Sequence, residues 1–387
     1  MLAISAVVPT YNVEQYIEET LLSLAEQTMP LSEILVIDDC SSDCTLEKVE
    51  VLRTAVDVPI VIIRHHKNKG AAIARNHGIA AAKGDWVLFM DADDVAESCL
   101  VEKEITYLLK LQETAADKWS AVYSAYLQIN AEGIAISGSI RGQQLTPQNA
   151  FGCLLIRNLI STSGLLVKKT ELVAVGGFRG EGLVEDWDLW LRLAQQKNGF
   201  AYIDQPLVKV RRHLSNTSKN LSFGLQRELK VLKFYEPEVI RQAIFARDLS
   251  NLQNVTDSVG ILFKLGYWNE GYQKLRKEKE QSATLFFLQG LYWLWRKELT
   301  QAQFYLEKTL QNDENHGAAI NDLGVVYAVD GDLETARKLW QKALQLFPGY
   351  MDVEANLKIL GNTEIPQLAN FRITWRELRP ILLSYSE

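Results

Sequence analysis

Short apolar runs alternate with helix-patterned segments over the N-terminal part of the chain. Runs rich in Val, Ile and Leu predict strands at residues 2–9, 33–38, 59–64 and 86–90. Apolar residues at helical spacing, or alanine-rich stretches, predict helices at residues 14–27, from Thr45 onward and at residues 71–83. Strands separated by helices form parallel β-α-β units, and uniformly apolar strands are covered on both faces. The pattern therefore predicts an α/β fold with a Rossmann-like, mostly parallel sheet.

Polar side chains gather where three of these strands end. Thr10-Tyr11-Asn12 follows the first strand, Asp38-Asp39 ends the second, and Asp91-Ala92-Asp93-Asp94 follows the fourth. Ligands of open α/β sheets bind outside the carboxyl ends of the strands. We therefore expect the three segments to converge on one site.

Strand signals end near Ser250, and a helical repeat takes their place. Two consecutive windows of equal length, residues 283–316 and 317–350, align without a gap. The matched positions are Gly290 and Gly324, Trp293 and Tyr327, Ala302 and Ala336, and Leu306 and Trp340. This period is typical of tetratricopeptide (TPR) repeats, which place small residues where paired helices touch. Residues 255–279 resemble a degenerate third unit, residues 372–385 are a candidate capping helix, and ordinary helical hairpins are the alternative.

Composition narrows the class of protein. A chain of 387 residues is too long for one ordinary core, and 47% hydrophobic with 23% charged residues is typical of folded proteins. The net charge of −7 argues against a nucleic-acid binder, which needs a basic face. An anionic nucleotide is still compatible, because a metal ion and a few cationic side chains neutralise a diphosphate locally.

We expect neither a membrane span nor a secretion signal. No run of about 18 uncharged apolar residues occurs, and a strand pattern begins almost at Met1 without a basic leader. The four cysteines are too few and scattered for a disulfide framework, and Cys40 and Cys44 lack the second pair that a metal site needs. A cytoplasmic protein is expected.

Asp91, Asp93 and Asp94 form the first acidic cluster. Their mutual repulsion is costly unless a cation lies among them. Oxygen ligands suit Mg²⁺ or Mn²⁺, and Mg²⁺ takes one or two carboxylates together with substrate phosphates. The alternative is a solvated turn that caps the next helix, but the position opposite Asp38-Asp39 favours a metal site.

Two further segments carry candidate ligand contacts. Asp38 and Asp39 are suited to accept from a base N–H or a ribose hydroxyl, whereas residues 41–43 fit helix caps. The small residues of 69–76 allow a phosphate or ribose to approach the start of a helix. Arg75 in that helix either points into the site or is a surface arginine.

A second acidic cluster, Glu185-Asp186-Trp187-Asp188, begins another predicted helix. Carboxylates at a helix N-terminus are favoured by the helix dipole, which is one explanation. The other is a general base for an attacking hydroxyl, opposite a metal-bound diphosphate. His213 fits a metal ligand, a phosphate contact or a structural histidine.

Together these motifs resemble the family 2 glycosyltransferases, which have the nucleotide-sugar-binding GT-A fold. The resemblance covers residues 2–215, and four motifs in order are far more specific than any one of them. They are Val8-Pro9-Thr10-Tyr11-Asn12, Val36-Ile37-Asp38-Asp39-Cys40-Ser41-Ser42-Asp43, Met90-Asp91-Ala92-Asp93-Asp94, and Gly176-Gly177-Phe178 with Glu185-Asp186-Trp187-Asp188-Leu189-Trp190.

The resemblance implies a role for each matching residue. The donor nucleotide, typically uridine, would be held by Pro9, Thr10, Tyr11, Asn12, Asp38, Asp39, Arg75, Asp91 and Ala92. Asp93 would bind the metal ion, Mn²⁺ or Mg²⁺, and His213 matches a position that joins the metal or diphosphate in some relatives. Asp186 would be the catalytic base. The neighbourhood of base and acceptor would comprise Glu185, Trp187 and Asp94.

The implied reaction is a one-step inverting transfer from a nucleotide sugar, most often UDP-linked, to a hydroxyl of a glycan, lipid-linked or protein acceptor. Cys40 stands where relatives usually have glycine, which implies a differently shaped loop. The Gln-x-x-Arg-Trp motif and membrane helices of processive relatives are not found in the sequence, which favours a single transfer.

The resemblance and the helical repeat pattern together divide the chain into four parts: a GT-A catalytic domain (1–220), a helical linker (221–250), TPR-like repeats (251–360) and a capping or tail segment (361–387). The repeats are expected to bind a partner protein, a second copy or the acceptor, or only to cap the catalytic domain. Contact with the membrane surface is expected if the acceptor is lipid-linked.

Two other readings compete with this one. A nucleotidyltransferase would carry an N-terminal glycine-rich phosphate loop, but residues 7–15 contain no glycine. A TPR-type interaction scaffold with a degenerate nucleotide-sugar domain predicts the loss of Asp39, Asp93 or Asp186, and all three are present.

Overall fold

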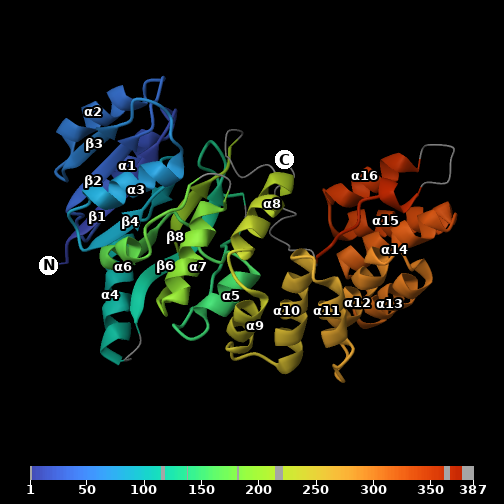
Figure 1. The fold of residues 1–387 in the computed structure, drawn as a ribbon. Helices are drawn as coiled ribbons and strands as arrows, with labels where there is room; N and C mark the ends of the chain where they lie inside the picture. The colour runs from blue at the N-terminus through green and yellow to red at the C-terminus, as the bar shows by residue number, and fades with distance from the viewer. Residues whose placement is uncertain are drawn as a thin grey trace. The chain divides into compact units, whose positions relative to one another are not determined.

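The computed structural model describes residues 2–114, 118–136, 138–180, 183–213, 221–360 and 367–376. The chain forms two compact units, Met1–Asp248 and Leu249–Glu387. The first combines strands and helices, and the second is helical (Figure 1).

An eight-stranded sheet forms the centre of the first unit, in the order β3-β2-β1-β4-β7-β6-β8-β5. The strands are β1 (Ile4–Thr10), β2 (Glu33–Asp38), β3 (Ile60–Arg64), β4 (Trp86–Phe89), β5 (Val95–Ala96), β6 (Trp119–Ile129), β7 (Leu165–Lys168) and β8 (Gly199–Arg211). Strands β1 to β4 pair in parallel, as do β6 and β8. Strand β7 is antiparallel to β4 and β6, and β5 to β8. The predicted α/β class is confirmed, and the antiparallel pairs make the sheet mixed.

Nine helices of the first unit lie within the described ranges. They are α1 (Ile17–Ala25), α2 (Thr45–Ala55), α3 (Ala71–Ala81), α4 (Leu100–Thr114), α5 (Ala150–Ile156), α6 (Lys169–Ala174), α7 (Glu185–Gln195), α8 (Leu221–Leu232) and α9 (Pro237–Phe245). The crossovers through α1 and α2 run from β1 towards β3, whereas the one through α3 returns to β4. Right-handed crossovers therefore place α3 on the face opposite α1 and α2.

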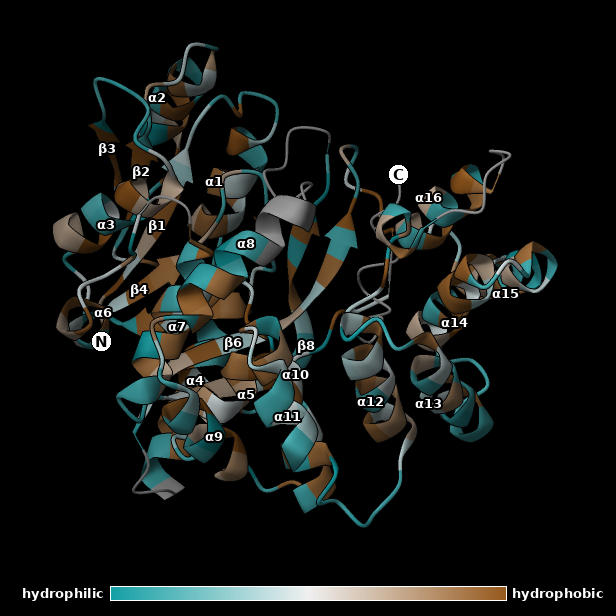
Figure 2. Cartoon of the chain, turned by 45° about the vertical axis from the view of Figure 1, so that its right-hand side comes forward, coloured by the Kyte–Doolittle hydropathy of each residue, from teal (hydrophilic) through white to brown (hydrophobic). Residues whose placement is uncertain are grey.

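Alternate residues of β1 pack on opposite faces of the sheet. Ile4, Ala6 and Val8 of β1 pack with the buried faces of α1 and α2. On the other face, a Cβ at Gly78 of α3 would lie 2.3 Å from Val7 Cγ1, so this close approach requires glycine. The strands β1 to β4 are predominantly hydrophobic (Figure 2), as expected for a sheet that is covered on both faces.

The second unit consists of helical hairpins in the predicted windows. Its helices are α10 (Asn251–Lys264), α11 (Trp268–Leu275), α12 (Ala283–Trp295), α13 (Leu299–Asn312), α14 (Gly317–Val329), α15 (Leu333–Leu346), α16 (Met351–Ile359) and the 3-10 helix η2 (Leu368–Asn370). A Cβ at Gly290 would lie 3.0 Å from the Leu306 side chain, and one at Gly324 would lie 2.5 Å from Trp340 Nε1. The residues matched between the two windows therefore meet in both hairpins, while membership of the TPR class stays a prediction.

The boundaries of the predicted parts are not settled by the division into two units. Helices α8 and α9, in the predicted linker, fall within the first unit, which ends at Asp248. Of the candidate capping helix, residues 372–376 are not helical, and the rest lies outside the described residues. The limits at 220, 250 and 360 stay predictions.

Candidate active site

The loops after β1 and β2 are joined at the carboxyl edge of the sheet. Asp39 N donates to the carbonyl oxygen of Thr10 (2.8 Å), and Asn12 N donates to Ser41 Oγ (3.0 Å). Thr10 is buried, whereas Tyr11 is 48% exposed. Because β1 pairs with both β2 and β4, the three polar segments lie at one edge of the sheet, as predicted.

Asp39 is held by three donors. Its carboxylate accepts from Lys69 N (2.8 Å), Gly70 N (2.7 Å) and His65 Nδ1 (2.7 Å), and His65 Nε2 lies 2.7 Å from His77 Nδ1. Burial alone would raise the pKa of Asp39, but these hydrogen bonds lower it below its usual value. Asp39 is therefore an anion that shapes the loop before α3.

Asp38 is completely buried. Its carboxylate accepts from Ser41 N (3.1 Å) and lies 3.4 Å from Arg64 Nε. This geometry supports an anchoring role, unlike the direct nucleotide contact that the resemblance implied. Two residues further on, Cys40 adopts a φ of 70°, in the left-handed region that favours glycine. The loop keeps a glycine-type backbone there, at a cost of about 1–2 kcal/mol.

Arg75 of α3 connects the two acidic clusters. Its Nη2 lies 2.7 Å from Asp91 Oδ1, and its Nη1 lies 3.8 Å from Glu185 Oε1. The guanidinium lies over the Phe178 ring, 5.4 Å from its centroid. Arg75 is 7% exposed, so the alternative of a surface arginine is wrong.

Asp93 and His213 form a pair, with His213 Nε2 2.8 Å from Asp93 Oδ2. Burial, together with the negative charge of Asp91, raises the pKa of Asp93. Across the described ranges, no set of three or more His, Cys, Asp or Glu side chains is arranged to hold a metal. The pair fits a site in which the protein supplies one or two ligands and a diphosphate supplies others.

Asp94, which the resemblance places near the base and the acceptor, binds the end of β8 and the side chain of Ser163. It is 2% exposed, and its Oδ1 accepts from Arg211 N (2.7 Å). Burial and the charges of Asp93 and Asp91 raise its pKa well above the usual value. Asp94 therefore anchors the end of β8 to the acidic loop.

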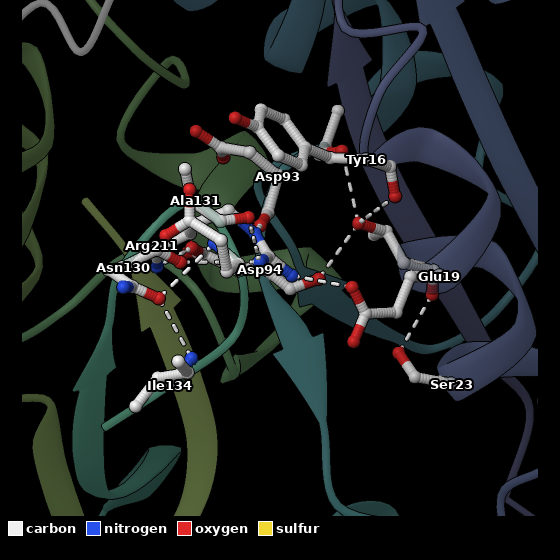
Figure 3. Close-up of polar contacts among 12 residues, drawn as sticks. Tyr16, Glu19, Ser23, Asp93, Asp94, Asn130, Ala131, Ile134 and Arg211 are labelled. Atoms are coloured by element: carbon white, nitrogen blue, oxygen red, sulfur yellow. Dashed lines mark hydrogen bonds and ion pairs between the residues drawn. The ribbon is translucent and has the colours of Figure 1, made fainter. Parts of the chain in front are cut away.

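Arg211 secures the same loop from several sides (Figure 3). Its side chain donates to the carbonyl oxygens of Asp93 (2.9 Å) and Ala131 (3.0 Å), and Nη2 lies 2.5 Å from Glu19 Oε2. Two other residues expected at the donor site contribute main-chain rather than polar side-chain groups. Pro9 of β1 pairs with Ile37 of β2, and the carbonyl oxygen of Ala92 accepts from Thr20 Oγ1.

Asp186 lies in the first turn of α7, as the helical pattern predicted. Its Oδ2 accepts from Asn158 Nδ2 (3.0 Å) and Thr162 Oγ1 (3.5 Å), and its Oδ1 from Trp187 N (2.6 Å). Burial and the charge of Glu185 raise the pKa of Asp186 to about 6, although Arg75 opposes the shift. Asp186 is therefore anionic at neutral pH and basic enough to accept a proton.

Trp187, which the resemblance places near the base and the acceptor, packs against α5. It is buried, and its Nε1 donates to the carbonyl oxygen of Leu154 (2.6 Å), so it fixes α7 against α5.

Sequence reasoning did not identify several residues that contact the site. Asn158 and Thr162 bind Asp186, Ser163 Oγ accepts from Asp91 N (3.0 Å), and Asn76 binds both main-chain groups of Phe178. Asn76 stood inside the segment 69–76 that already suggested a ligand site. The segment 158–163 has no motif, and only the folded chain shows that it adjoins Asp186.

The sequence profile of Glycosyl transferase family 2 matches residues 5–152. The matched span contains the three strand-end segments and Arg75, while Asp186 and His213 lie beyond it. Within the described residues, no helix has the length and apolar character needed to cross a membrane.

Named relatives extend the match. WfgD of Escherichia coli, described as UDP-Glc:alpha-D-GlcNAc-diphosphoundecaprenol beta-1,3-glucosyltransferase, is 30% identical over 232 residues, covering 59% of this chain and 85% of that protein. An uncharacterized glycosyltransferase of Haemophilus influenzae is 27% identical over 245 residues, covering 62% of this chain and 79% of that protein. This chain belongs to family 2 of the glycosyltransferases, and the predicted enzyme class is confirmed.

A solved structure shares the fold. The crystal structure of S. aureus TarS 1–349 in complex with UDP-GlcNAc aligns with a TM-score of 0.51 at 19% identity, covering 89% of this chain and 92% of that chain. At this identity the likeness concerns the fold alone, and it confirms the predicted GT-A class followed by helices.

Proposed function

We propose that this glycosyltransferase moves a sugar from a UDP-linked donor to an acceptor hydroxyl, with inversion and with a divalent metal ion. The observation that carries the proposal is Arg75, which lies 2.7 Å from Asp91 and 3.8 Å from Glu185. One buried cation therefore joins the acidic loop expected to bind the donor to the helix end that carries the base. Diphosphate and acceptor would meet at this junction.

The donor nucleotide would lie over the loops after β1 and β2. Tyr11 is exposed and can stack on a base, and the anionic Asp39 holds the Lys69-Gly70 backbone that borders the site. A uridine nucleotide is the first choice because the name of WfgD specifies UDP-Glc and TarS was solved with UDP-GlcNAc. Asp91, which is partly exposed, would contact the ribose or the metal.

Asp93 and His213 would hold the metal ion, Mn²⁺ or Mg²⁺. A bound divalent cation acts as a Lewis acid and stabilises the negative charge of the departing diphosphate. The pair provides a carboxylate and an imidazole 2.8 Å apart, and a cation would offset the burial and the charge of Asp91 that raise the pKa of Asp93. Arg75 would add a fixed positive charge nearby.

Asp186 would be the general base. The acceptor oxygen forms a bond to the anomeric carbon, the bond from that carbon to the diphosphate oxygen breaks on the opposite face, and the hydroxyl proton passes to the Asp186 carboxylate. Asn158 and Thr162 would orient this carboxylate. Glu185 raises its basicity through charge repulsion.

The acceptor is proposed to be a glycan, with a lipid-linked glycan favoured because the name of WfgD specifies a diphosphoundecaprenol-linked acceptor. An enzyme with this acceptor would work in the cytoplasm at the membrane surface. A protein acceptor is the remaining chemical class with a suitable hydroxyl.

A donor screen tests the proposal directly. The full chain is incubated with Mn²⁺ and a panel of nucleotide sugars, and the released nucleoside diphosphate is measured. Release from at least one UDP-sugar is expected. If no donor is hydrolysed and no nucleoside diphosphate binds, the chain is a scaffold with a degenerate nucleotide-sugar domain instead.

The metal assignment is tested by calorimetric titration of UDP with and without Mn²⁺. Asp93→Asn is expected to abolish the metal-dependent part of UDP binding. Asp85→Asn, an exposed residue just before β4, serves as the matched control and should bind like the wild type. Unchanged metal dependence in Asp93→Asn would refute the assignment.

A further inference from the structure

A short segment near the end of the described chain, Phe371–Trp375, lies against the helical repeats without forming a helix or strand. It is held by polar side chains of α14 and α16. We call Asn321, Asp322 and Asn356, which make these contacts, the amide clamp.

The amide clamp binds the main chain of the segment. Asn356 accepts from Arg372 N (2.7 Å) and donates to the carbonyl oxygen of Arg372 (2.8 Å). Asp322 Oδ1 accepts from Thr374 N (2.7 Å). Asn321 Nδ2 donates to the Arg372 carbonyl oxygen (3.1 Å) and to Thr374 Oγ1 (3.1 Å). Because these main-chain contacts are to alternate residues, Arg372 and Thr374, the clamp binds one edge of an extended chain.

Side chains of the segment add selectivity. The Phe371 ring lies 5.7 Å from the ring of Trp340, and the Trp375 ring lies 5.4 Å from that of Trp268. The Thr374 hydroxyl contacts Tyr350 and Asp352. The side chains that contact the helices are therefore aromatic at Phe371 and Trp375, aliphatic at Ile373 and hydroxylated at Thr374.

The burial of the clamp is costly unless its polar atoms are paired. Asn321, Asp322 and Asn356 are all 0% exposed, and apolar residues would be the cheaper choice for the inner faces of packed helices. Here the amides of Asn321 and Asn356, and Oδ1 of Asp322, pair with main-chain atoms of an extended segment. Binding an extended chain through its main chain, with pockets for its side chains, is a general mode of peptide recognition.

We propose that the amide clamp is an exchangeable peptide-binding site, which the chain's own segment Phe371–Trp375 occupies, and that the same segment of a second copy takes its place when it is released. Such exchange of an identical element is a low-cost route to self-association. The proposal is independent of the sugar-transfer chemistry of the first unit.

The test uses the full chain and a fluorescent peptide of residues 367–376. Thr374→Pro in the protein removes the N–H that Asp322 accepts from and the hydroxyl, while the clamp residues stay intact. Because the internal competitor is weakened, we expect the peptide to bind this variant at least about tenfold more tightly than the wild type in fluorescence anisotropy. Equal affinity for variant and wild type would overturn the proposal.

Three controls locate the site. A peptide with proline in place of Thr374 should not bind the released variant. Adding Asn356→Leu to the released variant should abolish binding of the normal peptide. Adding Asn254→Leu, which replaces a buried asparagine of α10 that donates to Leu249, should not. Loss of binding in both double variants would indicate general damage to the repeats and count against the clamp.

Hydrogen exchange of the unmodified chain decides the case if Thr374→Pro does not fold. The amides of Arg372 and Thr374 should exchange at least about tenfold faster than the buried amides of α14, because the segment opens locally. Excess unlabelled peptide should leave the α14 amides unaffected. If the two sets exchange at the same rate, the segment is an integral part of the fold and the proposal is wrong.

Discussion

The candidate active site of the first unit leaves charged side chains partly open, whereas the amide clamp of the second unit encloses its polar groups. The side chains of Asp91 and Glu185 are 37% and 34% exposed, on either side of the buried Arg75. The clamp residues are fully buried. Charges at an open edge can be matched by a small ligand from solvent, whereas the enclosed groups of the clamp are matched by a peptide segment.

The difference shows how to read buried polar residues in this chain. Asp38 and Asp94 belong to the acidic motifs of the first unit, yet both are buried and bind main-chain N–H groups of neighbouring segments. They resemble the clamp more than they resemble Asp91. Exposure and binding partner separate a ligand-facing carboxylate from an anchoring one, and the motif alone does not.

Replacing the proposed base should have the largest effect. Asp186→Asn removes the proton acceptor and leaves the donor loops untouched, so kcat should fall about 10²–10⁴-fold while the donor KM stays near the wild-type value. Steady-state kinetics with the donor from the screen will measure both constants. Glu185→Gln at the adjacent position is the control and should lose far less. Normal turnover by Asp186→Asn would mean that another group is the base.

The pH dependence of kcat should show the titration of Asp186. Because the base acts when deprotonated and the pKa of Asp186 is raised to about 6, kcat should fall about tenfold per pH unit below pH 6. Stability should move the other way: the folded pKa exceeds the unfolded value, so this stabilisation is present at low pH and is lost as pH rises through about 6. A kcat that is flat between pH 5 and 7 would contradict the assignment.

A change inside a helical hairpin should damage only the second unit. In Gly324→Ala the new Cβ would lie 2.5 Å from Trp340 Nε1, so overpacking should cost about 1–3 kcal/mol. Calorimetry should show a lower melting temperature for one transition, with donor hydrolysis unchanged at 25 °C. Gly260→Ala, where an added Cβ meets no atom within 4 Å, is the matched control. Equal destabilisation by both would contradict the packing argument.

The smallest effect is expected from a buried acid that neither region uses. Glu104 of α4 is fully buried, and neither carboxylate oxygen has a hydrogen-bond partner among the described residues. Burial raises its pKa well above the usual value. The stability that this raised pKa contributes is fully present below the unfolded pKa and is lost as pH rises through the folded pKa.

Glu104→Leu should therefore stabilise the first unit by about 1 kcal/mol at neutral pH and make its melting temperature less dependent on pH. Thermal unfolding at pH 5 and pH 8 will measure this. Glu102→Leu, whose side chain is exposed on the same helix, is the control and should change little. A less stable Glu104→Leu variant would point to an ionised, paired Glu104.

Local pattern was sufficient for the elements with strong periodicity. Strand β2 has the predicted limits, 33–38, helix α7 begins at Glu185, and the glycines matched in the two repeat windows meet their matched partners. These features depend on side chains a few residues apart, or on a period that repeats along the chain. The sheet edge that gathers the acidic segments follows from the same strand pattern.

Pairing between distant segments was decided only by the tertiary structure. Strand β7 is four residues long and gives no period, yet it enters the sheet antiparallel between β4 and β6. Arg211 N binds Asp94, and Asn158 binds Asp186, across long stretches of chain without a shared motif.

The sequence by itself determined the α/β class, the helical repeats, the family and the acidic segments at the strand ends. The tertiary structure decided which carboxylates stay open, that Arg75 is buried between the two acidic clusters, and that Phe371–Trp375 lies on the amide clamp. The physical reason is that burial and hydrogen-bond partners depend on the whole packed chain, whereas periodicity and motif order are properties of neighbouring residues.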